Sequence, residues 1–146
     1  MKLVIAVVLS ILLLSLLTFG FLSTLALERK SPNEKIEEEK ILVFDDKVVI
    51  NVKGAKLVSY SNTNSMDPLL DENAKGIEIK PSAPEQIKVG DIISYKKGKE
   101  IISHRVVEVG KDEKGWFCKT KGDNNLFLDG KIRFEQIVGV LVIVIY

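Results

Sequence analysis

Cysteine and histidine are nearly absent from this chain of 146 residues, which contains only Cys118 and His104. One cysteine excludes an intrachain disulfide, and one cysteine with one histidine cannot form the usual ligand sets of zinc. Net charge is also small, because 21 basic residues face 20 acidic ones, so no basic excess favours nucleic acid as a partner. We therefore expect no metal, no cofactor and no nucleic-acid partner.

The single cysteine lies in the stretch Trp116–Thr120, whose composition is typical of a β-strand. We expect Cys118 to be a small buried residue of that strand. A catalytic thiol paired with His104 is the alternative, but no neighbouring loop has the character that activates a thiol.

Charged residues are also absent from residues 3–27, a run of 25 residues dominated by Leu, Val, Ile and Phe. As a helix rising ~1.5 Å per residue, this run is roughly 37 Å long and can cross a bilayer core. The apolar region of a signal peptide has only ~7–15 residues, so residues 1–27 are predicted to be an uncleaved anchor. A cleaved signal peptide is the alternative. Because Lys2 precedes the run and Arg29, Lys30 and Lys35 follow it, the positive-inside rule does not fix the orientation.

The remaining chain divides into a charged segment, residues 28–40, and a domain, residues 41–146. We expect the segment to be a solvated linker that lifts the domain off the membrane. The domain is predicted to be mainly β, with a coiled or partly closed sheet, because short runs rich in Val and Ile alternate with polar turns. The predicted strands are residues 41–44, 47–53, 56–60, 76–80, 89–95, 100–109, 115–121 and 136–145.

Ser65 lies in a polar turn that follows the predicted strand 56–60 and is closed by Pro68. A serine becomes a nucleophile when a base removes its proton and nearby donors stabilise the oxyanion. The backbone N–H of Ser65 and the hydroxyl of Thr63 are candidate donors. Met66 is the apolar residue of this turn and is expected to point inward.

His104 is the base available to such a serine, since it is the only histidine and it lies in a predicted strand. In a strand, His104 and Arg105 point to opposite faces. Asp123 and Asp129 lie in the polar loop 122–130. Either carboxylate can accept a hydrogen bond from the imidazole and fix its tautomer, although both residues are also typical of turns.

Five ordered motifs resemble the type I signal peptidases, specifically the branch of archaea and the endoplasmic reticulum, which uses histidine where the bacterial enzymes use lysine. The motifs are Asn64-Ser65-Met66-Asp67-Pro68, Val89-Gly90-Asp91-Ile92-Ile93, His104-Arg105-Val106-Val107-Glu108-Val109, Thr120-Lys121-Gly122-Asp123-Asn124-Asn125 and Val138-Gly139. They cover about residues 57–142. The resemblance implies a signal-peptidase-like β-sheet fold behind one N-terminal transmembrane helix.

The resemblance implies that Ser65 is the nucleophile and His104 the general base. The carboxylate partner maps best to Asp129, and Asp123 would support the site from a second position. Asn64 stands where the family usually has glycine, and asparagine tolerates the left-handed conformation better than most residues.

The resemblance further implies a membrane-anchored serine endopeptidase that cleaves signal peptides from exported preproteins, with its domain on the extracytoplasmic side. Shallow pockets would take small residues at the first and third positions before the cut. We expect an extended substrate along Asn62–Asn64 and Ile92–Tyr95. Residues 3–27 would contact lipid, and accessory membrane subunits are left open as partners.

Two alternatives remain at this point. The domain can be a non-catalytic, membrane-tethered module that binds extended peptides, or a processing peptidase dedicated to a narrow set of substrates such as pilin-like or surface-layer proteins. Residues 71–86 resemble an insert, which either shapes substrate access or covers the sheet.

Overall fold

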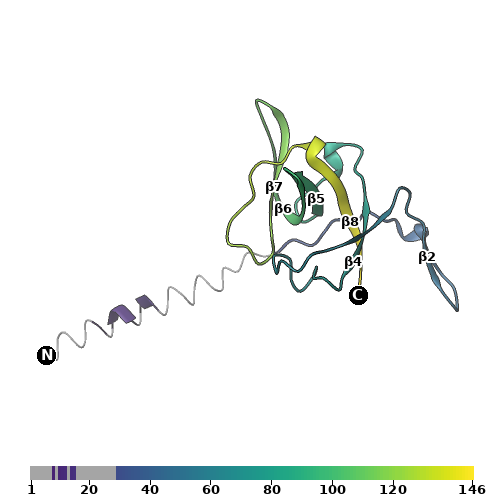
Figure 1. The fold of residues 1–146 in the computed structure, drawn as a ribbon, viewed down its shortest axis with the longest axis horizontal. Helices are drawn as coiled ribbons and strands as arrows, with labels where there is room; N and C mark the ends of the chain where they lie inside the picture. The colour runs from purple at the N-terminus through teal and green to yellow at the C-terminus, as the bar shows by residue number, and fades with distance from the viewer. Residues whose placement is uncertain (1–7, 9, 13, 16–28) are drawn as a thin grey trace.

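The computed structural model describes residues 8, 10–12, 14, 15 and 29–146 (Figure 1). The few described residues of the apolar N-terminal run are helical. Most of the predicted membrane span, residues 3–27, lies outside the described part of the chain. Within that described part, no helix combines the length and apolarity required to cross a bilayer.

The prediction of a mainly β domain is confirmed, because residues 29–146 form eight strands in two antiparallel sheets. The strands are β1 (Ile41–Val43), β2 (Val48–Ile50), β3 (Lys56–Ser59), β4 (Lys75–Ile79), β5 (Ile92–Lys97), β6 (Glu100–Asp112), β7 (Gly115–Lys121) and β8 (Ile137–Ile145). Three single-turn 3₁₀ helices accompany them, η1 (Glu38–Lys40), η2 (Pro84–Gln86) and η3 (Phe134–Gln136).

The larger sheet has six strands in the order β3-β4-β8-β5-β6-β7. β4 lies inside residues 71–86, the stretch that resembles an insert. It confirms the predicted strand 76–80 within one residue and pairs with β3 on one side and β8 on the other, so this part of the stretch belongs to the sheet and does not merely cover it. The reason is the alternating pattern of residues 75–79, which gives β4 one buried face and lets it join the sheet.

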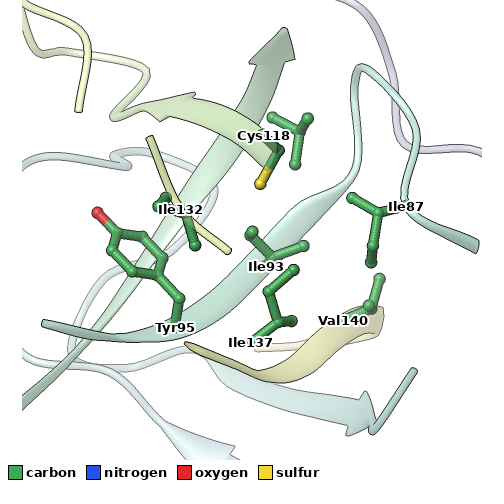
Figure 2. Close-up of a cluster of buried hydrophobic side chains, with 8 residues drawn as sticks. Ile87, Ile93, Tyr95, Cys118, Ile132, Ile137 and Val140 are labelled. Atoms are coloured by element: carbon green, nitrogen blue, oxygen red, sulfur yellow. The ribbon is translucent and has the colours of Figure 1, made fainter. Parts of the chain in front are cut away.

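Most of the core lies on one face of this sheet, where alternate residues of neighbouring strands meet. Figure 2 shows this cluster, with Ile93 and Tyr95 from β5 packed near Val140 and Ile137 from β8. Cys118 belongs to the cluster and is fully buried, as the sequence predicts. A smaller cluster consists of Met66, Leu70, Ile92 and Leu141. The inward position predicted for Met66 is therefore confirmed.

The predicted strands 41–44 and 47–53 form the hairpin β1–β2, which turns at Asp45 and Asp46 and pairs Ile41 with Ile50. It stands apart from the six-stranded sheet (Figure 1). Its apolar side chains are exposed rather than packed into the core. The alternation of apolar residues predicts the strands, but it cannot show whether another sheet covers them.

The segment after the apolar run is docked on the domain, so the prediction of a solvated linker is wrong for residues 29–35. Asn33 and Lys35 both bind the carboxylate of Asp91, whose side chain is fully buried. Arg105 donates from Nη1 to the carbonyl oxygen of Lys30 at 3.1 Å. A buried carboxylate requires a cation and hydrogen-bond donors, and this segment supplies them.

Candidate active site

Three side chains from separate parts of the chain form one hydrogen-bonded series. The Nε2 atom of His104, on β6, lies 3.2 Å from the Oγ atom of Ser65, in the loop after β3. The Nδ1 atom of the same ring lies 2.7 Å from Oδ2 of Asp129, in the loop after β7. Since both ring nitrogens have partners, the imidazole is oriented to accept the serine proton at Nε2 while Nδ1–H donates to the carboxylate.

Asp129 is held as a carboxylate by two donors. Burial opposes its ionisation, but the hydrogen bonds from His104 and from Thr120, whose Oγ1 lies 2.7 Å from Oδ2, outweigh this effect and lower the pKa of Asp129. Burial and the nearby Asp129 charge raise the pKa of Tyr95, so its hydroxyl stays protonated. Thr120 is part of a motif of the sequence, but the sequence pattern does not indicate this role as a donor to Asp129.

The loop that presents Ser65 has an unusual backbone conformation at the preceding residue. Asn64 has φ +59°, in the left-handed region that glycine adopts most readily and asparagine tolerates. This explains how Asn64 occupies the position where the resembling family usually has glycine. The Nδ2 atom of Asn124 donates to the carbonyl oxygens of Asn64 and Asp67, at 2.8 and 3.0 Å. The backbone N–H of Asn124 donates to the carbonyl oxygen of Ser65. Asn124 therefore fixes the loop, a role that the sequence pattern does not indicate.

Thr63 lies close to the candidate nucleophile. Its Oγ1 atom is 3.0 Å from Oγ of Ser65. Within residues 29–146, no acceptor takes the backbone N–H of Ser65. The hydroxyl of Thr63 and this N–H therefore both lie close to the Ser65 hydroxyl, and their role as oxyanion donors stays a prediction.

Asp123 does not contact the imidazole. Its carboxylate forms a two-pronged ion pair with Arg105, from Nε to Oδ1 at 2.8 Å and from Nη2 to Oδ2 at 2.7 Å. Asp123 is therefore not a partner of the base, and it occupies the second, supporting position that the resemblance implies. The alternation of β6 explains the difference, because His104 and Arg105 point to opposite faces and each binds its own aspartate.

The alternative of a catalytic thiol fails on the chemistry of Cys118. Burial raises the pKa of this thiol to about 12, so the reactive thiolate is scarce at neutral pH. The two ring nitrogens of His104 face Ser65 and Asp129 instead.

A groove of about 790 Å³ leads to Ser65 and His104. Its walls include β3 and residues 100–104 of β6. β7 pairs only with residues 105–112 of β6, so the described chain leaves one backbone edge of residues 100–104 open. Residues 92–95, predicted to offer an edge for substrate, lie in β5 between β6 and β8, so that prediction is wrong for this strand. The sequence shows that β5 is a strand, but not which strands flank it.

The geometry of this site determines its chemistry. A hydroxyl, an imidazole and a carboxylate form a hydrogen-bonded series, and this series lines a groove that has an open strand edge. Such an arrangement can carry out nucleophilic acyl transfer on an extended peptide. Comparison of the chain with protein-family models, with curated proteins and with solved structures gives no match.

Proposed function

We propose that the protein is a membrane-anchored serine endopeptidase that cleaves signal peptides from exported preproteins, similar to the archaeal and endoplasmic-reticulum branch of the type I signal peptidases. The observation that carries the proposal is the series Ser65–His104–Asp129, with distances of 3.2 and 2.7 Å. The six-stranded sheet would be the coiled β domain of that family, and residues 3–27 its anchor.

The first half of the reaction forms an acyl-enzyme. His104 Nε2 takes the proton from Ser65 Oγ as this oxygen attacks the scissile carbonyl carbon, while the Asp129 carboxylate stabilises the imidazolium. His104 then gives the proton to the leaving amine, and the peptide bond breaks.

Water completes the second half. His104 accepts a proton from a water molecule that attacks the acyl carbon, and Ser65 leaves with that proton restored to its oxygen. In both halves the backbone N–H of Ser65 and the hydroxyl of Thr63 stabilise the negative oxygen. Because Asn124 already holds the loop in place, these donors need little reorganisation.

The substrate would bind as an extended strand in the groove. The open edge of residues 100–104 ends at His104, so a peptide paired with this edge runs towards Ser65. The outer edge of β3 lines the other wall of the groove. A strand in this position has its backbone paired, while its side chains alternate between the groove floor and solvent.

The docked segment supports a position of the catalytic loops near the proposed membrane anchor. Arg29 donates from Nη2 to the carbonyl oxygen of Asp123 at 2.8 Å, two residues after the apolar run ends. The same loop exposes Leu126, Phe127 and Leu128, which are 86, 83 and 55% exposed. An apolar loop tip beside a membrane exit would contact the bilayer surface, and it would keep the site close to membrane-inserted substrates on the extracytoplasmic side.

The decisive experiment is cleavage of a labelled preprotein by the purified full chain in detergent. Wild type should produce one defined cut, and Ser65→Ala should produce none. Ser82→Ala, which removes an exposed hydroxyl away from the groove, is the matched control and should cleave like wild type. Cleavage by Ser65→Ala at the wild-type rate would refute the proposal.

The competing function is a peptide-binding module without catalysis. The open edge of residues 100–104 and the groove would serve such a module equally well. It predicts that the wild-type chain binds the preprotein but leaves it intact, and that Ser65→Ala binds with the same affinity.

A further inference from the structure

A row of polar side chains crosses the groove near the candidate nucleophile. Lys56 of β3 pairs with Glu78 of β4, and Ser94 of β5 pairs with Ser103 of β6. All four residues line the groove that also contains Ser65. Ser94 donates from Oγ to Oε1 of Glu78 at 2.6 Å, and its Oγ also lies 2.6 Å from Oγ of Ser103. The row therefore places one carboxylate among hydroxyl groups.

Glycine residues reserve the space that this carboxylate occupies. β8 separates β4 from β5 in the sheet, so Glu78 has to cross it to reach Ser94. It does so over Gly139, where a Cβ atom would collide with Oε2 of Glu78. At Gly76 a Cβ atom would collide in the same way with the hydroxyl of Tyr60, which also lines the groove.

The charge of Glu78 is not balanced by a neighbouring cation. The residue is only 5% exposed, and no lysine, arginine or histidine of the described chain lies within ion-pair distance of it. Burial raises the pKa of Glu78, although Ser94, Tyr60 and the more distant charge of Lys56 oppose the effect. The groove is lined by two glutamates, Glu78 and Glu100, but by one lysine, Lys56. A ligand that brings a positive charge would correct this imbalance.

We propose that Glu78 is a specificity-determining residue that binds a lysine or arginine side chain of the substrate strand in the groove. The inference rests on the proposed function, because it assumes an extended peptide positioned for attack by Ser65. The basic group would donate to the Glu78 carboxylate and to the hydroxyls of Ser94 and Ser103. An apolar side chain of the same length would bring no hydrogen-bond donor to the Glu78 carboxylate and the two serine hydroxyls. The site should therefore bind a substrate with such a side chain more weakly.

The test uses the purified full chain with a series of peptides that differ at one position close to the cut. At each position we compare lysine with norleucine, its apolar isostere, and with glutamate. Wild type should cleave the lysine peptide with a kcat/KM about ten-fold or more above the norleucine peptide at one position. Glu78→Gln should bring this ratio close to one. Glu113→Gln, which removes the same charge from the exposed turn between β6 and β7, should retain the preference.

Two results would overturn the inference: equal cleavage of lysine and norleucine peptides at every position by wild type, or an unchanged preference in Glu78→Gln. If Glu78→Gln does not fold, the preference for lysine over norleucine is tested with Glu78→Asp and with the wild-type peptide series instead. If wild type cleaves none of the peptides, the proposed peptidase fails, and binding decides separately about Glu78. In that case the Ser65→Ala chain should bind the lysine peptide about ten-fold more tightly than the norleucine peptide, and equal affinities would refute the role of Glu78.

Discussion

Asp123 and Asp129 belong to one loop and bind adjacent residues of β6, Arg105 and His104 respectively. The two contacts lie on opposite sides of the strand because successive side chains alternate. One aspartate therefore fastens the loop, and the other orients the imidazole. The two carboxylates should respond differently to mutation, which separates the stability of the site from its chemistry.

Asp129→Asn should impair catalysis without unfolding the protein. The amide keeps the shape of the side chain but loses the charge that stabilises the imidazolium, and it allows the wrong ring tautomer. By analogy with serine proteases, kcat should fall by about 10²–10⁴-fold. Single-turnover cleavage with a thermal unfolding control measures both effects. Activity within two-fold of wild type would show that this carboxylate is not a partner of the base.

Thr120→Val tests whether the second donor holds Asp129 in its charged form. The substitution keeps the volume of the side chain but removes the hydroxyl 2.7 Å from Oδ2. With one of its opposing hydrogen bonds gone, burial should raise the pKa of Asp129 from its lowered value. A carbon-13 NMR titration of this carboxyl group measures the change. An unaltered titration would assign Thr120 to packing alone.

Asp123→Asn should cost stability more than chemistry. The mutation leaves the guanidinium of Arg105, which is largely buried, without its two-pronged partner, and losing one member of such a pair costs about 3 kcal/mol. Glu108→Gln is the matched control, because it breaks the more exposed pair with Lys119 and should cost about 1 kcal/mol or less. Chemical denaturation of the three proteins gives the comparison. Equal losses in both variants would contradict the anchoring role of Asp123.

The docked segment should make stability sensitive to acid. Burial opposes the ionisation of Asp91. The hydrogen bonds from the Lys35 ammonium, from the backbone N–H groups of Lys88 and Asn33 and from the Asn33 side chain outweigh burial and lower the pKa of Asp91. The unfolded chain therefore binds a proton at Asp91 at a higher pH than the folded chain. The contribution of Asp91 is complete above its unfolded pKa, about 4, and is lost as pH falls through the lower folded value.

Asp91→Asn should accordingly be less stable than wild type at pH 7, with a smaller loss of stability between about pH 5 and pH 2. Thermal unfolding across this range measures both features. If the stability of the variant and of wild type falls equally with pH, groups other than Asp91 cause the acid sensitivity.

The apolar loop tip should matter only for substrates in a membrane. Replacing Leu126, Phe127 and Leu128 by serine should slow cleavage of a preprotein embedded in lipid vesicles several-fold, because the site would be held less closely to the bilayer. Cleavage of a short soluble peptide should not change. An equal loss on both substrates would indicate damage to the neighbouring Asp129 instead.

The strands could be predicted because their signal is local. Alternating Val and Ile residues with polar turns predict β3, β4, β6, β7 and β8 within a few residues. The prediction begins β5 three residues early, since residues 89–91 form the turn that receives the docked segment. Their spatial order could not be predicted, because pairing depends on contacts between distant residues. As a result, the place of β4 inside the sheet was not foreseen, and β5 was expected to offer an edge.

The sequence by itself determined the residue types available for chemistry: one serine in a polar turn, one histidine and two aspartates in a later loop. Only the tertiary structure decided that Asp129 contacts His104 while Asp123 binds Arg105, and that Glu78 reaches the same groove as Ser65. The physical reason is that side-chain identity and alternation are properties of the local chain. The meeting of residues 65, 104 and 129 depends instead on long-range strand pairing and on the space that glycines leave between strands.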